Sequence, residues 1–584
     1  MGKGIVKLGE GNWAVKDGNL LAAKETNNRF KNAEFTVTRG TDATYVGKDG
    51  LIKTTPSFYN LIDYSEDFSE WTNTDITFGA NGVSAGGGTN ANLIQTGTAG
   101  SDQVSKLFTL SATNTTTYSV FIKRVSGAEW IDFLIVKSGF SNSLKVWFDI
   151  NNGTVGSNNA TGTTSFDSAS IENYGNDWYR LIVTTTDSTN NTSFNIRVRT
   201  ASADGSDTRV NNSSYYLWGA QLVEGTEALD YQYTNGKEGI PRIDFTNNTD
   251  GHLLLEPEST NLITYSEDFE QWTEEANIDV TNNSITSPDG TQNAAKLQLT
   301  GSSSETDGKI SFAVSPSATT HTFSVFAKKG SHNYIYIWMN ISGADNITRW
   351  VNLDDGSVSQ SDVTTTSFGN DWWKIQFTFD ATNLTGVRLE VADYGVSTGT
   401  GGDNIYVWGA QLEALSYPTS YIPTNGSTVT RDAETCTGAG EAADFNSEEG
   451  VLYAEIAALA NDGNWREISL NDGSTNNAVE IRYKSTDDQF QFVVRDGGTV
   501  VVSPTRPLTN PLEFIKVAFS YKTDDFKMYI NGADVATDTD GTMPSGLNNL
   551  SFDWGGTNPF YGKCKAIRVY KEALSDTDLQ NLTS

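Results

Sequence analysis

The chain has 584 residues, of which 37% are hydrophobic and 11% are aromatic. This length is too great for a single hydrophobic core and predicts three or four domains, while the apolar content excludes a wholly disordered chain. Acidic residues outnumber basic residues by 72 to 40, and the resulting net charge of −32 argues against binding to nucleic acid or anionic membranes. No apolar run approaches the roughly 20 residues that span a bilayer, so we expect no membrane insertion.

The cysteine content is low, with Cys436 and Cys564 as the two members. Two cysteines cannot build a disulfide framework or a cysteine-rich zinc site. Two buried thiols are favoured over a single bridge between them. The first ten residues lack an apolar stretch of signal-peptide length, so export by that route is not expected.

The predicted elements begin with residues 1–58, an N-terminal anchoring and entry segment. Within it, residues 13–15, a turn at residues 17–18 and the apolar residues 20–21 predict a small hairpin. Such a piece could anchor the protein to a larger assembly. The alternative is a strand that completes the following domain.

A duplication covers most of the chain between residues 59 and 416. Five segments recur in the same order, and their offset stays between 190 residues (222 to 412) and 205 residues (118 to 323). The pairs are 60–71 and 261–272, 118–124 and 323–329, 147–153 and 350–356, 175–178 and 369–372, and 216–222 and 406–412. We therefore expect residues 59–230 and 260–416 to be two copies of one domain, joined by a linker at residues 231–259.

Each copy has the pattern of a β domain. Short runs of β-branched and aromatic residues, such as 118–122 and 181–184, are bounded by turns rich in Gly, Asn and Asp. No long stretch has helical periodicity. A domain of about 160 residues built from short antiparallel strands is predicted to be a sandwich or jelly roll.

The opening of each copy (NLIDYSEDFSEW at residues 60–71) resembles the first strand of jelly-roll carbohydrate-binding modules. The closing segment (YLWGAQL at residues 216–222) lies where such modules end with an aromatic residue and an acidic pair. Here residues 218–219 and 408–409 are Trp-Gly, which removes acidic ligands of a structural calcium ion. We therefore expect no cofactor, doubt a structural calcium ion, and assign no metal ligands.

Three connecting segments resemble parts of bacteriophage tail and virion proteins. They are residues 38–52, residues 252–257 and residues 418–431. The last of these falls in the second predicted linker, residues 417–444. The resemblance implies a virion protein assembled in the host cytoplasm, released by lysis and displayed on the virion surface.

The last predicted domain, residues 445–584, differs from the repeats. Residues 566–576 resemble the final strand and tail of laminin-G-like, concanavalin-type lectin domains, and Ser575 is placed to N-cap a short helix over residues 576–582. The fold class predicted for the whole chain is all-β, with tandem antiparallel β-sandwiches: two jelly-roll repeats plus one concanavalin-like sandwich.

Catalytic patterns are not evident in the sequence. His252, His321 and His332 are scattered, and a catalytic triad or zinc site would need them clustered. Glycoside hydrolysis needs two carboxylates across the scissile bond. The candidate strands that begin at Glu467 and Glu480 lack the partner carboxylates that concanavalin-type glycanases carry on one strand. We therefore predict that the protein is not an enzyme.

Candidate glycan-binding residues lie on strands with strict alternation. Tyr334, Tyr336 and Trp338 are predicted to project from one face of a strand, and aromatic rings stack on the C–H faces of sugars. The matching region of the first copy offers Trp130 and Asp132. The competing interpretation places these rings in a sandwich core or a subunit interface. Tryptophans at repeated motif positions are assigned to cores: Trp71, Trp178, Trp218, Trp272, Trp372 and Trp408.

Three classes of function follow from these patterns. The preferred one is a non-enzymatic phage virion surface protein, a fibre or capsid decoration, that adheres to host or environmental glycans. Its other partners would be virion proteins. The symmetry of surface fibres favours a homo-oligomer, and a trimer is the preferred state. The alternatives are a purely structural assembly protein and a secreted glycan-processing enzyme with binding modules. The missing catalytic pattern and missing signal peptide count against the enzyme.

Overall fold

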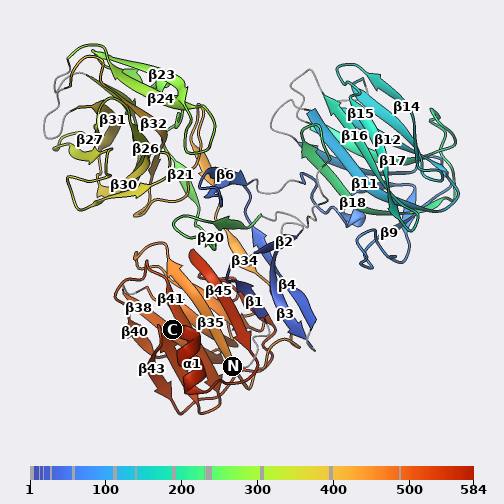
Figure 1. The fold of residues 1–584 in the computed structure, drawn as a ribbon. Coiled ribbons are helices and arrows are strands. Elements are labelled where there is room, and N and C mark those ends of the chain that lie inside the picture. Colours follow the sequence, from blue (N-terminus) through green and yellow to red (C-terminus); the bar gives the residue numbers. More distant parts are fainter. Residues whose placement is uncertain are drawn as a thin grey trace. The chain divides into compact units, whose positions relative to one another are not determined.

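The computed structural model describes most of the chain (Figure 1). The described residues are 6–11, 13–16, 19–26, 29–55, 60–109, 115–137, 141–186, 193–228, 231, 234, 240–302, 308–392, 399–485 and 488–584. The chain forms two compact units. The smaller unit comprises Lys16–Gly18 and Phe58–Glu238, and the larger comprises Met1–Val15, Asn19–Ser57 and Gly239–Ser584. The fold is all-β, as predicted.

The smaller unit contains the first sandwich, whose two six-stranded antiparallel sheets enclose one core. One sheet has the order β14-β13-β12-β17-β10-β7 and the other has the order β15-β16-β11-β18-β9-β8. A short 3₁₀ helix, η1 (Phe68–Glu70), precedes the strands. The strands are β7 (Thr72–Thr74), β8 (Ile76–Phe78), β9 (Asn92–Thr96), β10 (Gln103–Thr109), β11 (Thr115–Ser126), β12 (Trp130–Lys137), β13 (Ser143–Asp149), β14 (Thr154–Thr161), β15 (Ser168–Gly175), β16 (Trp178–Thr186), β17 (Ser193–Ala201) and β18 (Ser214–Glu224).

The second sandwich has the same topology and lies in the larger unit. Its sheets have the orders β22-β25-β31-β27-β28 and β23-β24-β32-β26-β30-β29. The elements are η2 (Phe269–Gln271), β22 (Thr273–Glu274), β23 (Ile278–Ile285), β24 (Ala294–Leu299), β25 (Lys309–Ala313), β26 (Thr320–Lys329), β27 (Tyr334–Ile341), β28 (Ile347–Asn352), β29 (Val363–Ser367), β30 (Trp372–Asp380), β31 (Leu384–Val391) and β32 (Asn404–Glu413). Eleven strands correspond one to one in sheet order, and β14 is the strand of the first copy without a named counterpart. The predicted duplication is therefore confirmed.

The repeated sequence motifs join the first and last segments of each sandwich. Asn60 donates its side-chain amide to the carbonyl of Ala220 (2.8 Å) and accepts from the backbone N–H of Leu222 (3.1 Å). In the second copy Asn261 makes the same two bonds, to Ala410 (3.1 Å) and from Leu412 (3.1 Å). These buried bonds explain why the opening Asn and the closing Gly-Ala-Gln-Leu recur together.

The Trp-Gly pair that replaces the expected acidic residues lies at a β-bulge. The register between β11 and β18 shifts between Ser119 and Phe121, opposite Gly219. Gly219 has a φ of 59°, and a Cβ there would lie 2.9 Å from the Phe121 ring. Glycine is therefore required by both backbone conformation and packing.

The last domain contains the sheet with the order β34-β4-β3-β1-β45-β35-β41-β42-β43, onto which β2, β19 and β20 also pair. Its second sheet has the order β39-β38-β37-β36-β44, with β40 on β38. The strands are β1 (Val6–Gly9), β2 (Ala14–Lys16), β3 (Asn19–Thr26), β4 (Arg29–Thr38), β19 (Arg242–Asp244), β20 (His252–Leu255), β34 (Thr435–Thr437), β35 (Glu449–Ala458), β36 (Arg466–Asn471), β37 (Ala478–Tyr483), β38 (Gln489–Asp496), β39 (Thr499–Val502), β40 (Thr505–Pro507), β41 (Ile515–Lys522), β42 (Phe526–Ile530), β43 (Ala533–Asp538), β44 (Asn549–Ser551) and β45 (Gly562–Tyr570). Two small two-stranded sheets complete the unit: β5 (Ala43–Val46) pairs with β6 (Ile52–Thr55) as a hairpin, and β21 (Ser259–Asn261) pairs with the distant β33 (Val429–Arg431).

The final helix, α1 (Asp576–Thr583), confirms the prediction from Ser575. The Ser575 hydroxyl accepts from the backbone N–H of Asp578 at 3.2 Å, which satisfies one of the free N–H groups at the start of the helix. Leu579 and Leu582 pack this helix against the outer face of the large sheet, beside Tyr529 and Tyr570.

The N-terminal segment is a part of the last domain's sheet. β1 pairs with β45 through four residue pairs, from Val6 opposite Val569 to Gly9 opposite Ala566, and β4 pairs with β34. Leu8, Leu20 and Phe35 lie in the same core as the strands of the last domain. The interpretation of residues 1–58 as a separate anchoring piece, or as a strand of the first sandwich, is therefore wrong for β1 to β4, whereas β5 and β6 form a sheet of their own. The hairpin itself is present as β2 and β3, and its predicted turn at residues 17–18 lies outside the described residues.

The two predicted linkers also contain strands of the last domain. β20 pairs with β45, and its Leu253 and Leu255 are buried in the last domain's core. Two apolar residues on one face of a four-residue strand such as β20 are too short a pattern to be distinguished from a linker in the sequence.

Cys436 of β34 and Cys564 of β45 are both free and buried in the same core, as expected, and burial raises the pKa of both thiols.

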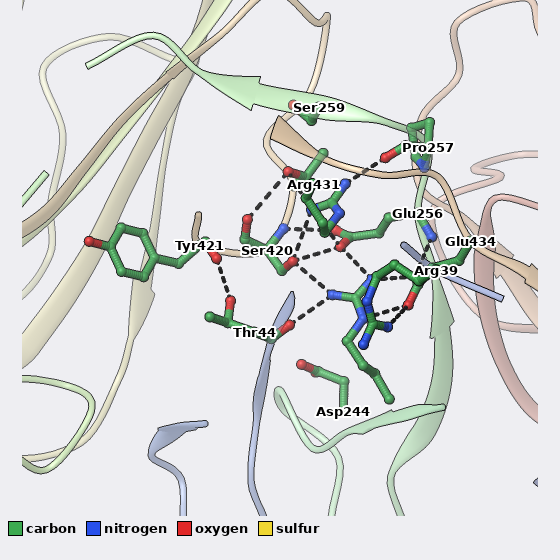
Figure 2. A network of polar contacts seen from close by, with 12 residues as sticks. Arg39, Thr44, Asp244, Glu256, Pro257, Ser259, Ser420, Tyr421, Arg431 and Glu434 are labelled. Carbon is green, nitrogen blue, oxygen red and sulfur yellow. Dashed lines mark hydrogen bonds and ion pairs between the residues drawn. The ribbon is translucent and has the colours of Figure 1, made fainter. Parts of the chain in front are cut away.

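A buried ionic cluster joins the connecting segments of the larger unit (Figure 2). This connector cluster consists of Arg39, Arg242, Glu256, Arg431 and Glu434, whose side chains are at most 3% exposed. Glu434 accepts from Arg39 (2.5 Å) and from the Nε of Arg242 (2.9 Å). Glu256 pairs with Arg242 (2.8 Å) and Arg431 (3.0 Å). Each carboxylate is therefore shared between two guanidinium groups.

Backbone and hydroxyl groups saturate most of the remaining donors in the connector cluster. Arg242 donates to the carbonyl of Thr44 (2.7 Å), and Arg431 donates to the carbonyl of Pro257 (2.6 Å). Ser420 donates its hydroxyl to Glu256 at 2.7 Å. Burial alone would raise the pKa of Glu256, but Arg431 and Arg242 lower it to about 2. The cluster is therefore fully ionised near neutral pH.

We expect Glu434→Gln to destabilise the larger unit by about 3–5 kcal/mol, because it leaves two buried guanidinium groups with one carboxylate too few. Urea denaturation of the full chain measures the loss. The matched control is Glu258→Gln, which removes an exposed carboxylate from the same connecting segment. Equal stability of the two variants would contradict a structural role for the cluster.

Candidate functional site

An aromatic patch lies on the outer face of one sheet in the second sandwich. On β27, Ile335, Ile337 and Met339 point into the core, so the alternating Tyr336 and Trp338 point away from it. Trp350 of β28 is directly opposite Tyr336 in the ladder. The predicted alternation is confirmed, and the rings do not belong to the core between the two sheets. Whether they bind a glycan stays a prediction.

The rings of Tyr336, Trp338 and Trp350 pack against one another. Tyr336 and Trp350 stack with ring centroids 3.7 Å apart and planes at 11°, and Tyr336 lies 4.8 Å from Trp338. Tyr336 and Trp350 are each 8% exposed, while Trp338 and Tyr334 are half-buried. Tyr336, Trp338 and Trp350 together are called the aromatic face below. Of these three, Trp338 has the most ring surface open to a ligand.

Charged side chains border the aromatic face. The indole N–H of Trp338 donates to Glu390 at 2.8 Å, and the Lys309 ammonium lies 5.2 Å from the Trp338 ring centroid. Arg388, opposite Trp338 on β31, pairs with Glu275 at 3.5 Å. Glu390 and Lys309 are buried, so the polar groups open to a hydroxyl-bearing ligand beside Trp338 are Arg388 and Glu275, whose side chains are partly exposed.

The corresponding face of the first sandwich has different chemistry. Trp147 of β13 is opposite Asp132 of β12, just as Trp350 is opposite Tyr336. Asp132 is fully buried and pairs with Arg199 and, at 3.2 Å, with Arg209. Burial raises the pKa of Asp132, and the two guanidinium groups oppose that effect. The predicted site residue Asp132 is therefore fully engaged inside the protein.

Trp130, the other predicted residue of the first copy, lies at the edge of this face. It is half-buried on β12, and Trp147 donates its indole N–H to the carbonyl of Ser206 at 2.9 Å, which holds the segment after β17 over the face. The structure therefore brings Trp130 and Asp132 to one face but offers less open ring surface than the second copy. Sequence reasoning missed Trp147 and Trp350 as residues of the outer face. A usable signal was present, because a tryptophan recurs in both copies on the strand that follows the one with the predicted site residues.

The tryptophans at repeated motif positions divide between two environments. Trp71 and Trp272 lie in the cores between the sheets, as predicted. Trp178, Trp218, Trp372 and Trp408 are also buried, but in separate clusters on the outer face of the other sheet. There the connecting segments supply Tyr231 in the first copy and Tyr421 in the second. All six tryptophans are therefore buried in hydrophobic clusters, as predicted, although four of them lie outside the core between the two sheets.

A polar hollow recurs beside the Ser-Glu-Asp-Phe motif of each copy. In the first copy it has a volume of about 510 Å³ and is lined by Glu66, Asp67 and Asn90, and in the second, with about 600 Å³, by Glu267 and Asp268 among others. Asparagine amides donate to these carboxylates, for example Asn293 to Glu267 at 2.9 Å. Within the described residues, no group of three or more His, Cys, Asp or Glu is arranged to hold a metal ion.

The last domain carries two glutamates that come together on the outer face of its smaller sheet. Glu467 of β36 and Glu480 of β37 share Arg482, whose Nη1 lies 2.9 Å and 3.2 Å from their carboxylates. Neither strand carries the second carboxylate that concanavalin-type glycanases have on one strand, as predicted, but diagonal positions on adjacent antiparallel strands place Glu467 and Glu480 side by side.

These two carboxylates are closed to a substrate. Both side chains are fully buried, and Arg495 also pairs with Glu480 at 2.7 Å. The Cζ atom of Arg482 lies 4.3 Å from the centroid of the Trp465 ring, and that of Arg495 lies 4.1 Å from the centroid of the Trp554 ring, so the two rings cover the guanidinium groups. Burial, with the charge of Glu467, raises the pKa of Glu480 to about 7 against the two arginines. The pair therefore lacks the access that hydrolysis requires.

Comparison with known proteins supports the assignment of the last domain. Residues 442–580 match the Concanavalin A-like lectin/glucanases superfamily. No curated protein sequence matches the chain. No helix among the described residues is long and apolar enough to cross a membrane.

Solved structures resemble parts of the chain at low similarity. The CBM40 module of the Ruminococcus gnavus IT-sialidase, bound to α2,3-sialyllactose, is 18% identical, with 25% of this chain and 94% of that chain covered and a TM-score of 0.22. The tandem CBM22 domains of a Paenibacillus barcinonensis protein are 13% identical, with 62% and 98% covered and a TM-score of 0.21. Domains LG4-5 of the mouse laminin α1 chain are 12% identical, with 48% and 91% covered and a TM-score of 0.17.

The raised pKa of Glu480 predicts a pH-dependent stability of the last domain. The folded state retains a proton that the unfolded state releases above about pH 4.5, so stability should fall as the pH rises from 4.5 to 7. The expected loss is at most about 3 kcal/mol. Glu480→Gln should flatten this slope in urea denaturation at pH 5, 6, 7 and 8, whereas exposed Glu572→Gln should not. If the stability of Glu480→Gln fell with pH as steeply as that of the wild type, the pH dependence would not arise from Glu480.

Proposed function

We propose that this protein binds glycans without hydrolysing them and is displayed on a bacteriophage particle as a fibre or decoration. The lectin-superfamily match of residues 442–580 supports carbohydrate binding as the general class of function. The aromatic face of the second sandwich is the observation that carries the proposal to a specific place on the chain.

The chemistry of the aromatic face suits a sugar ring. A sugar presents a flat set of C–H bonds, which pack against an indole, and hydroxyl groups at its rim. Trp338 offers the ring, and the partly exposed Arg388 and Glu275 lie beside it, while the buried Glu390 holds the indole N–H. Trp350 stacks beside Tyr336 and keeps the rings next to Trp338 rigid, so little side-chain entropy is lost on binding. One such contact gives modest affinity, which many copies on a particle would multiply.

The state of the candidate carboxylates supports a non-enzymatic function. Glu467 and Glu480 are both fully buried; Glu467 pairs with Arg482, and Glu480 pairs with Arg482 and Arg495. The three histidines lie apart, with His252 on β20, His321 on β26 and His332 before β27. A purely structural protein remains the competing proposal, and direct binding separates the two.

We expect Trp338→Ala to weaken binding to the chain's glycan ligand at least about tenfold, because it removes the exposed stacking surface. A glycan array with the wild-type chain identifies the ligand, and titration of the variant measures the loss. Tyr174→Ala is the matched control, since it removes an aromatic ring that is 49% exposed in the first sandwich.

Thermal unfolding of Trp338→Ala provides the fold control. Lost binding with an unchanged melting temperature supports the proposal, and Trp338→Phe should restore part of the affinity. Unfolding of the variant, or unchanged binding by a folded variant, would contradict it. Absence of any ligand on the array would favour the purely structural protein.

The virion assignment rests on the three connecting segments that resemble virion proteins. Arg39, Glu256 and Arg431 come one from each of these segments and meet in the connector cluster. We propose that the protein forms a homo-oligomer on the particle and that this homo-oligomer is a trimer. Immunogold labelling of purified particles should place the protein on their surface, and light scattering at micromolar concentration should give three chains per assembly. Unlabelled particles would refute the location, and a monomer would refute the assembly.

A further inference from the structure

A cavity of about 380 Å³ lies in the larger unit beside the connector cluster. The connecting segments line it with Thr44, His252 and Ser420, the outer face of the second sandwich with Lys374, and the last domain with Lys563. This volume lies within the range of small-molecule sites. None of its lining residues belongs to the aromatic face.

Lys374 places an amine without a direct ion-pair partner against this cavity, and the carboxylates of Glu413, Glu256 and Asp244 act on it only from a longer distance. It lies on β30, opposite Phe326 of β26 and Thr366 of β29, and the neighbouring Ile375 points into the sandwich core. Lys374 makes no hydrogen bond or ion pair with the described part of the chain. It keeps partial exposure, yet burial lowers the pKa of its ammonium. A long flexible side chain retained in such a place calls for an anionic partner.

His252 also faces the cavity with unused hydrogen-bonding groups. Its side chain is 2% exposed, and within the described residues neither ring nitrogen has a hydrogen-bond partner. The nearest carboxylate oxygen, Asp244 Oδ1, lies 3.8 Å from its Nε2. Burial lowers the pKa of His252 to about 4, so the ring is neutral at pH 7 and can donate one N–H to a ligand.

The charges around the cavity leave one positive charge unmatched. In and beside the connector cluster, three cations (Arg39, Arg242 and Arg431) face three anions (Glu256, Glu413 and Glu434). Of the two carboxylates that line the cavity, Glu256 is already paired with Arg242 and Arg431, so Lys374 and Lys563 face the one remaining carboxylate, Asp244. Two cations and one anion give a net charge of +1. In a chain with a net charge of −32, an interior site of this sign is selective for an anion.

The rest of the lining fits a hydroxylated ring. Gln376, Thr366 and Asn247 offer amide and hydroxyl groups, while Phe368 and Leu512 offer apolar surface. We propose that the cavity binds a small organic carboxylate of monosaccharide size, a hexuronate, with its carboxylate on Lys374 and its N–H contact from His252. This site is separate from the aromatic face and does not depend on the proposed function.

Calorimetric titration of the full chain with sodium glucuronate tests the proposal, with glucose as the uncharged ring and sodium sulfate as the anion without a ring. We expect one glucuronate per chain, binding at least tenfold weaker for glucose and for sulfate, and at least a tenfold loss in Lys374→Met. Lys48→Met, which removes an exposed lysine, is the matched control.

The histidine ring signals give a second readout, because the chain has three histidines. Glucuronate should shift one ring signal, and His252→Asn should identify it. If Lys374→Met fails to fold, Gln376→Leu replaces it as the test variant. Equal binding in wild type and Lys374→Met, no binding at 10 mM, equal binding of sulfate, or an unmoved His252 signal would overturn the proposal. Trp338→Ala should leave glucuronate binding unchanged, which separates this site from the aromatic face.

Discussion

The architecture of the larger unit depends on burying five charged groups together. Arg39, Arg242, Glu256, Arg431 and Glu434 come from segments hundreds of residues apart, and none could be buried singly. The buried carboxylates remain ionised because each lies between two guanidinium groups and accepts hydrogen bonds from backbone donors such as the N–H of Glu256. The requirement is geometric, since displacing one segment would leave the others with unpaired buried charge. The cluster therefore fixes the path of the connecting segments, and the cavity with Lys374 follows from the same arrangement.

Duplication preserved the sandwich while its outer surfaces diverged. The bonds of Asn60 and Asn261 to the closing strands are the same in both copies, and so is the glycine at the bulge. On the outer face, however, Asp132 with two arginines occupies the position that Tyr336 holds in the second copy. A side chain on that face can change without disturbing the core, so the two sandwiches can differ in what they bind.

Much of the fold could be predicted from the sequence, because strand alternation, turn residues and repeated motifs are local signals. The helix after Ser575, the duplication and the outward direction of Tyr336 and Trp338 were all accessible in this way. Pairings between distant segments were not accessible. Neither the pairing of β1 with β45 nor the meeting of Arg242 with Glu434 leaves a pattern in a single sequence. The partnership of Glu467 and Glu480 was missed for the same reason, since it depends on the register between two strands.

Hydrogen exchange of the full chain in increasing urea most directly tests the central claim that the N-terminal strands and connecting segments fold as part of the last domain. The account predicts that backbone amides of β4, β20 and β45 lose protection together, at one urea concentration, because they share one sheet and one core. Loss of protection in β4 and β20 at a lower urea concentration, with β45 still protected, would contradict it.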